Sequence, residues 1–178
     1  MRRAWLAALV AAIVLAGCAT QQATGPRQYS TPDSLAGRMT VKVDATPTSQ
    51  ARNVTAVFDL QGTPEQGKLD LSTPLGTVLA QARWAPGKVA LVTSQGETAF
   101  ATLDELTREV LGESLPVAAL FDWLRGRPWP GAPSTSDGDK AFKQLGWTVS
   151  LAQFGDGLIA ASRAEAPAVS VRAKLDAQ

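Results

Sequence analysis

The chain has 178 residues and is close to neutral, with 17 Lys and Arg against 16 Asp and Glu. It contains no histidine and a single cysteine, which excludes the usual general base, a His/Cys metal site and an internal disulfide. It also lacks a G-x-S-x-G elbow and an S-x-x-K pair. We therefore expect no enzyme, no cofactor or metal, and no nucleic-acid partner.

The N-terminus has the pattern of a lipoprotein precursor. Arg2 and Arg3 precede an apolar run, and Leu15-Ala16-Gly17-Cys18 resembles a bacterial lipobox. The run is shorter than the ~20 residues of a membrane-spanning helix, so residues 1–17 predict a cleaved signal peptide. Cys18 is then the expected lipidation site, and several acyl chains at about 0.8 kcal/mol per buried CH₂ form a lasting anchor. Ala19 replaces the Asp that inner-membrane lipoproteins of enteric bacteria often carry, which predicts the periplasmic face of the outer membrane.

Residues 18–34 are rich in Gln, Thr, Pro and Gly without an apolar period, which predicts that the lipidated Cys is followed by a flexible tether. From Leu35 the sequence alternates apolar and polar residues, the period of half-buried strands. Turn-forming residues separate the alternating runs. Six strands in a meander are predicted, around residues 39–43, 54–60, 68–72, 78–84, 89–93 and 98–100.

The third and fourth of these strands form a hairpin around Thr73-Pro74-Leu75-Gly76. Pro74 presets φ for a turn and Gly76 tolerates a positive φ, so Leu75 is held at the tip. Two interpretations are open. Leu75 either folds back under the sheet or is an ordinary exposed apolar residue, or it is a hydrophobic finger that touches a membrane.

The period then becomes helical. Thr102 and Glu105 form a capping box for a helix that ends at Gly112, and a second helix runs from Pro116 to Gly126. Their apolar stripes indicate either core packing or a lid over a cavity. Residues 127–140 predict a long irregular loop, and strands resume around 147–151, 158–160 and 169–175.

These elements predict one mainly β domain over residues 35–178 with a helical insert. About nine antiparallel strands would form a strongly curved sheet, an unclosed β-barrel covered by the helical lid. The small strand residues favour a cavity over a filled core. The candidate lining is Val41, Phe58, Leu71, Val78, Leu91, Phe100, Leu120 and Trp147, with Arg38 as a candidate head-group or interface charge.

Several stretches in order along the chain resemble the LolB family of outer-membrane lipoproteins. They are Leu35-Ala36-Gly37-Arg38, Phe58-Asp59-Leu60, Leu69 to Gly76, Leu111 to Val117, Trp123 to Pro128 and Gly146-Trp147. The resemblance implies an unclosed barrel with a helical lid, which takes acyl chains of lipoprotein cargo from the periplasmic carrier LolA and releases them into outer-membrane lipid. It also implies that Pro74, Leu75 and Gly76 form the membrane-insertion loop. We expect a monomer, although the sequence itself does not determine the oligomeric state.

The chain departs from that family pattern in three places. The stretch from Tyr29 to Leu35 is too short for the family's N-terminal amphipathic helix and is interrupted by Pro, and Leu60 stands where Trp is common. The usual aromatic residue near the end is also missing before Gln178. These departures predict a smaller or more open cavity. The alternative function is a lipid-anchored structural or assembly protein, which binds a protein partner and no lipid.

Overall fold

Eleven antiparallel strands form one sheet in the structure, a computed structural model that describes residues 34–177. Two helices and a short 3-10 helix complete the fold. The strands are β1 Ser34–Val43, β2 Arg52–Gly62, β3 Gly67–Ser72, β4 Val78–Ala85, β5 Lys88–Thr93, β6 Gly96–Phe100, β7 Ser134–Ser136, β8 Ala141–Gln144, β9 Trp147–Ser150, β10 Leu158–Arg163 and β11 Val169–Leu175.

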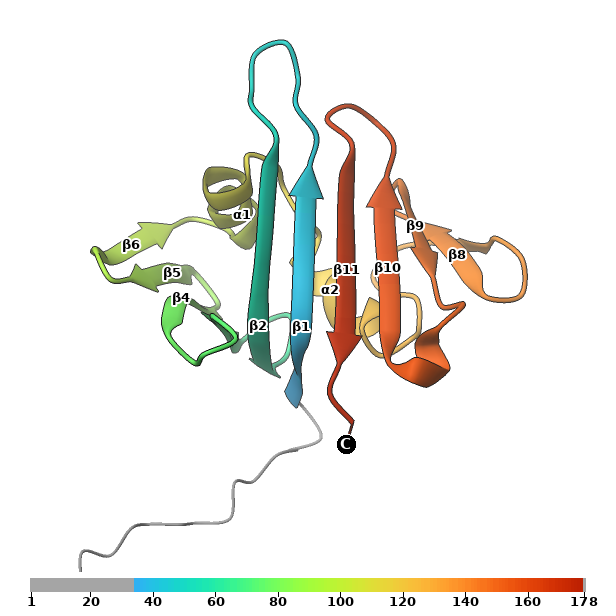
Figure 1. The fold of residues 1–178 in the computed structure, drawn as a ribbon, viewed down its shortest axis with the longest axis horizontal. Coiled ribbons are helices and arrows are strands. Elements are labelled where there is room, and N and C mark those ends of the chain that lie inside the picture. Colours follow the sequence, from blue (N-terminus) through green and yellow to red (C-terminus); the bar gives the residue numbers. More distant parts are fainter. Residues whose placement is uncertain (1–33, 178) are drawn as a thin grey trace, which may run out of the picture.

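The strand order is β6-β5-β4-β3-β2-β1-β11-β10-β9-β8-β7, so two meanders meet at the centre of the sheet. The first and last strands pair there, with Val41 opposite Val171. In Figure 1 the central strands stand upright and the outer strands turn back on both sides. Within the described residues β6 and β7 are the two edges and do not pair. The predicted unclosed, strongly curved antiparallel sheet is therefore confirmed.

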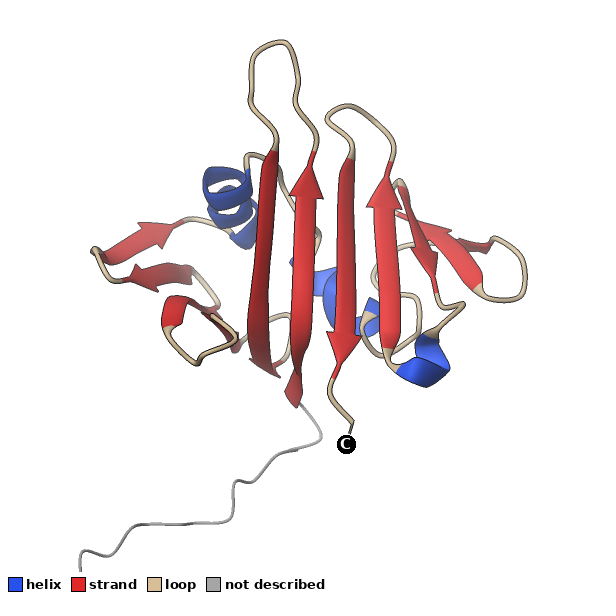
Figure 2. Ribbon diagram, viewed as in Figure 1, coloured by secondary structure: helices blue, strands red, loops and turns tan. Residues whose placement is uncertain are grey.

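Both helices lie on the concave side of the sheet, in the connection from β6 to β7 (Figure 2). Helix α1 spans Leu103–Leu111, and the first bond of its predicted capping box is present: the Thr102 hydroxyl accepts from the Glu105 amide at 3.1 Å. The Glu105 carboxylate accepts from the Ala101 amide at 2.9 Å, and Gly112 ends the helix with a φ of 81°. Helix α2 spans Val117–Trp123 and is shorter than predicted.

The segment 127–140 differs from its prediction, because it contains the strand β7, and β8 follows it at once. The prediction of about nine strands was therefore two short. The reason is that β7 has the sequence Ser-Thr-Ser and is wholly exposed, so it lacks the apolar alternation by which a strand is recognised. In β8 one of the inward-facing side chains is the polar Gln144.

Two clusters of buried side chains fill the space between sheet and helices. In the first, Trp123 packs edge-on against Phe142, with ring centroids 6.4 Å apart, and tilted against Trp147 at 5.9 Å. In the second, Trp84 packs edge-on against Phe121 at 5.9 Å. Helix α2 contributes to both clusters, so it is the central element of the core. Among residues 34–177 no helix has the length and apolar character to span a bilayer.

Candidate functional site: an apolar pocket and an exposed turn

An apolar pocket of about 130 Å³ lies between the helices and the β1–β5 part of the sheet. Of its lining side chains only Thr107 is polar. The Thr107 hydroxyl donates to the Asp104 carbonyl at 3.2 Å and accepts from the Leu115 amide at 3.1 Å, so its polar groups are satisfied within the chain. The lining is Met39, Val41, Val54, Ala56, Leu60, Leu69, Leu71, Ala80, Ala82, Leu91, Leu106, Thr107, Val110, Leu111, Leu115, Val117, Leu120 and Leu124. Such a wall suits a hydrocarbon and offers nothing to a polar ligand.

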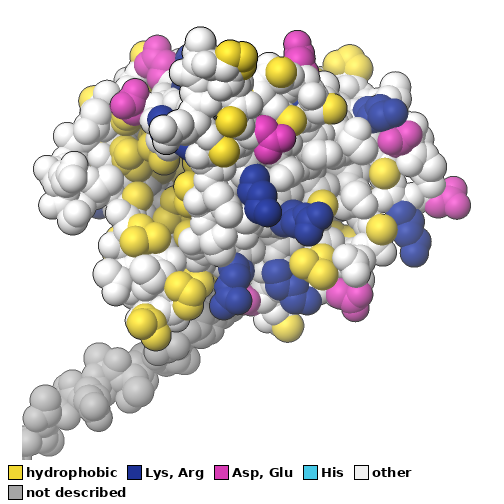
Figure 3. Space-filling view, turned by 45° about the horizontal axis from the view of Figure 1, so that its top comes forward, with side chains coloured by type: hydrophobic (Ala, Val, Ile, Leu, Met, Phe, Trp, Pro, Cys, Tyr) yellow, Lys and Arg dark blue, Asp and Glu magenta, His cyan; other side chains and the backbone are white. Residues whose placement is uncertain are grey.

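Small side chains create this space. Ala80 lies opposite Leu71, and Ala82 lies opposite Leu69, across the β3–β4 ladder. Because residues directly opposite in a ladder share a face, each alanine leaves room beside a leucine that points the same way. Ala56 in β2 lies opposite Met39 of β1, and both line the pocket. In Figure 3 hydrophobic side chains gather in a hollow on the side of the molecule where β4–β6 lie.

The predicted lining residues separate into three groups. Val41, Leu71, Leu91 and Leu120 line the pocket. Phe58 and Trp147 are 1% and 2% exposed and belong to the two packed clusters, and Phe100 packs against the second cluster. The prediction that Val78 lines the pocket was wrong, because Val78 is 65% exposed and lies outside the pocket.

An irregularity in the β3–β4 ladder explains the position of Val78. Leu71 pairs with Ala80, whereas the next residue, Ser72, pairs with Val78, so Leu79 is an extra residue in β4. An extra residue reverses the alternation of faces beyond it. Val78 therefore shares the outer face with Ser72, although simple alternation places it with Ala80 and Ala82.

The turn before this irregularity is an apolar projection. The Gly76 amide donates to the Thr73 carbonyl at 2.9 Å, Gly76 has a φ of 87°, and the Thr77 amide donates to the Thr73 hydroxyl at 3.1 Å. These bonds hold Leu75 outward, and it is 96% exposed. The alternative that Leu75 folds back under the sheet is therefore wrong. Leu79 is 45% exposed, so three apolar side chains, Leu75, Val78 and Leu79, form the tip.

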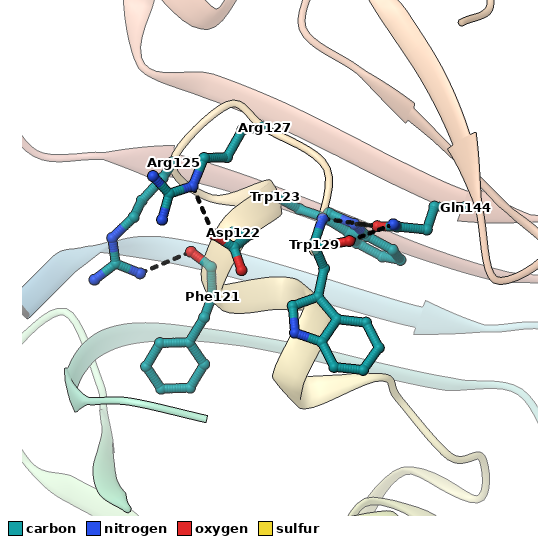
Figure 4. A network of polar contacts seen from close by, with 7 residues as sticks. All are labelled: Phe121, Asp122, Trp123, Arg125, Arg127, Trp129 and Gln144. Atoms are coloured by element: carbon teal, nitrogen blue, oxygen red, sulfur yellow. Dashed lines mark hydrogen bonds and ion pairs between the residues drawn. The ribbon is translucent and has the colours of Figure 1, made fainter. Parts of the chain in front are cut away.

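A polar framework that was not predicted holds the chain after α2 (Figure 4). Gln144 is 2% exposed, and its side-chain oxygen accepts from the Trp123 indole at 2.8 Å and the Trp129 amide at 2.9 Å. Its side-chain nitrogen donates to the carbonyls of Trp129 at 2.7 Å and Ala132 at 2.8 Å. The only sign of this framework in the sequence is the spacing of Phe142 and Gln144, two residues apart as in a strand. A polar residue at an inward position is, however, normally interpreted as the end of a strand.

Two arginines complete this framework. Arg127 pairs with the buried Asp122 at 2.6 Å, and Arg125 donates to the Phe121 carbonyl at 2.7 Å. The end of α1 is held differently, by the exposed Arg52 of β2, which donates to the Val110 carbonyl at 2.8 Å. Helix α2 is thus held by the buried bond of Trp123 to Gln144 and by these part-buried contacts, whereas the last turn of α1 is held by an exposed side chain.

Other predicted site residues lie away from the pocket or outside the described residues. Arg38 is exposed on the outer face of β1, directly opposite Lys174 of β11. The signal peptide 1–17, the lipidation site Cys18 and nearly all of the tether 18–34 fall outside residues 34–177. Within that described range no cluster of three or more potential metal ligands occurs.

Comparison with known proteins agrees with this geometry. The family described as "Outer membrane lipoprotein LolB" matches residues 34–174. The chain is 30% identical over 161 residues to the outer-membrane lipoprotein LolB of Chromobacterium violaceum, covering 88% of this chain and 85% of that protein. It is 34% identical over 173 residues to the protein of that name from Bordetella petrii, covering 92% and 86%. For the Cupriavidus metallidurans protein the values are 32% over 157 residues, 83% and 76%. The expected location, lipid-anchored in the outer membrane, is thereby confirmed, and the chain belongs to the LolB family of outer-membrane lipoproteins.

Proposed function

We propose that this chain accepts acylated lipoproteins from the periplasmic carrier LolA and inserts them into the outer membrane, to which Cys18 anchors it. The observation that carries the proposal is the pocket wall, in which Thr107 is the only polar side chain and its hydroxyl is already bonded. An acyl chain buries apolar surface there at about 25 cal/mol per Å². The proposed activity is therefore transfer by binding, without a covalent step.

The pocket must enlarge before it holds an acyl chain. Its volume of about 130 Å³ is below the ~300–1,000 Å³ of typical ligand sites. Leu106, Val110 and Leu111 of α1 form part of its wall, and the contact of Arg52 with the end of α1 is exposed. Outward movement of α1, together with the Leu115 backbone that is bonded to its Thr107, is thus the proposed route, because α2 is tied to β8 by the bond between Trp123 and Gln144.

Transfer needs no nucleotide in this scheme. If the carrier, this pocket and the bilayer bind acyl chains with increasing affinity, each step runs downhill, and only the differences in affinity matter. The pocket walls are apolar but small in area, so the bilayer offers the chain more contact. Cargo therefore leaves the pocket for the membrane.

The exposed turn is proposed to begin that release. Leu75 is 96% exposed, and Val78 and Leu79 follow it in the chain. Together they form an apolar projection from the part of the sheet that carries the pocket. Burying a leucine in the acyl region is favourable by roughly 1.5–3 kcal/mol. Pro74 and Gly76 keep the turn in a shape that holds Leu75 outward.

Replacing Leu75 tests this function. We expect Leu75→Glu to change the free energy of unfolding by no more than about 0.5 kcal/mol, because the side chain is exposed. The variant should still take a labelled lipoprotein from LolA but release little of it into vesicles, because a carboxylate opposes entry into the acyl region. The measurements are the melting temperature and the labelled fraction moved from carrier to vesicles.

The matched control is Leu75→Ile, which keeps the apolar volume and should retain most of the transfer. Normal delivery by Leu75→Glu would disprove the insertion step. If the unmodified protein takes up no acyl chain at all, the alternative of an assembly protein that binds a protein partner gains support.

A further inference from the structure

Four basic side chains gather on the outer, convex face of the central strands, far from the pocket wall. Arg38 and Lys42 come from β1, and Arg172 and Lys174 come from β11. Figure 3 shows Lys and Arg side chains grouped in the middle of this surface. All four are exposed, and we name this group the basic face.

The ladder register brings the charges together. Arg38 lies directly opposite Lys174, and Arg172 lies opposite Thr40, one step along the same face. Like charges directly opposite each other destabilise a sheet. The arrangement thus costs folding free energy, which is a reason to look for an anion that relieves it.

Among residues 34–177 no carboxylate forms an ion pair with a side chain of the basic face. The ion pairs among residues 34–177 involve Lys68, Arg127, Lys143 and Arg163, and none involves these four side chains. Lys174 donates to the backbone carbonyl of Asp156, which leaves its charge in place. The positive potential of this surface is therefore available to an external ligand.

The residues between the cations favour a lipid surface over a protein. They are Ala36, Thr40, Ala160, Ser162 and Ser170, with the aliphatic Val57 opposite Arg38 and Leu158 opposite Lys174, and none of these is aromatic. The core of a protein interface is enriched in aromatic residues and depleted of Lys, which is the opposite of this composition. Anionic headgroups require only positive charge without steric obstruction.

The attachment point also favours the membrane. Strand β1 begins at Ser34, sixteen residues after Cys18, and a chain of that length spans at most about 55 Å whatever its conformation. The anchor thus keeps the domain, and with it the basic face, within reach of the bilayer. We propose that the basic face binds the headgroups of anionic phospholipid and so orients the domain on the membrane. This proposal uses the membrane location and is independent of the transfer activity.

Vesicle flotation tests the proposal with the mature chain carrying Cys18→Ala, which has no acyl anchor. We expect it to float with vesicles of phosphatidylcholine and phosphatidylglycerol, more weakly with phosphatidylcholine alone, and less as salt is added. Arg38→Gln with Lys174→Gln should lower the partition coefficient by about 25-fold, since each cation contributes about fivefold.

The matched control is Lys88→Gln with Lys140→Gln, which removes two exposed cations elsewhere and should retain binding. Equal loss in both double variants would overturn the proposal, because net charge alone would then explain binding. Failure of the parent chain to float with anionic vesicles would also overturn it. Uptake of a fluorescent fatty acid by the Arg38/Lys174 variant should be normal, which separates this result from a failure of the pocket.

Discussion

The two halves of the sheet differ in how the space between the strands and the helices is filled. On the β8–β11 side, Trp123, Phe142 and Trp147 fill the space under the strands, and none of the residues that line the pocket comes from these strands. On the β1–β5 side, Ala56, Ala80 and Ala82 face the helices, and the pocket remains. Side-chain volume, rather than backbone topology, therefore decides where this open barrel is hollow.

The same division applies to how the helices are held. Trp123 of α2 donates a buried hydrogen bond to Gln144 of β8, and part-buried bonds of Gln144 hold the segment after α2, whereas the exposed Arg52 holds the end of α1. A buried bond costs more to break, because its partners are left without water. We therefore expect α2 to be held on the sheet more firmly than the last turn of α1.

Truncation of Trp123 should have the largest effect. Trp123 is fully buried, so Trp123→Ala should lower the free energy of unfolding by about 3–5 kcal/mol, through lost burial and the cavity left behind. Leu91→Ala on the pocket wall is the comparison and should cost about 1–2 kcal/mol, because Leu91 is only partly buried. Urea denaturation measures both. Equal costs would contradict the division into a packed and an open side.

Removal of the Gln144 amide should rank second. Gln144→Leu leaves the Trp123 indole and the backbone groups of Trp129 and Ala132 without partners, so we expect a loss of about 2–3 kcal/mol and faster proteolysis after α2. The exposed Gln153→Leu is the control and should change little. Unchanged proteolysis in Gln144→Leu would show that the framework does not hold this segment.

Filling the pocket should separate ligand binding from stability. Ala80→Phe places a ring in the pocket, so it should strongly reduce binding of an apolar dye while costing about 1–3 kcal/mol from overpacking. Val78→Phe adds its ring two residues away on the outer face and should leave dye binding unchanged. Dye titration and thermal melting of both variants are the measurements. Loss of binding in Val78→Phe would contradict the assigned faces of β4.

The smallest effect concerns Asp70 on the outer face of β3. Partial burial raises the pKa of Asp70, but hydrogen bonds from Lys68 and Gln81 and the positive charges of Lys68 and Arg83 outweigh it, so the pKa lies below its ordinary value of 3.8. The carboxylate of Asp70 therefore binds its proton less readily in the folded state than in the unfolded state. Its contribution to the free energy of unfolding is complete above pH 3.8 and is lost as the pH falls through the lower pKa of the folded state.

Asp70→Asn should therefore reduce stability at neutral pH by about 0.5 kcal/mol and bring no loss at strongly acid pH. Denaturation across this pH range measures it. A difference that persists at the acid end would show that the contribution of Asp70 does not depend on its charge.

Much of this protein follows from local sequence, because strand alternation, helix caps and turns depend on neighbours in the chain. The alternation of Met39 and Val41 with Arg38 and Lys42 assigned the two faces of β1 correctly. The pair Thr102 and Glu105 located the start of α1, and Pro74 with Gly76 located the turn that exposes Leu75. The family motifs and the unclosed sheet were recognisable for the same reason.

Tertiary structure decided the rest, because it depends on what lies across the space between elements. Alternation placed Phe58 and Trp147 inward, but only the packing of the helices decided that they fill the core while Leu71 and Leu91 face a pocket. The extra residue Leu79 turned Val78 outward through the pairing of two strands, which no single strand encodes. From the sequence alone, Gln144 is expected at the surface. In the fold it is buried, because Trp123 and the backbone of Trp129 supply its hydrogen-bond partners, and a polar group is buried at low cost only when other groups satisfy it.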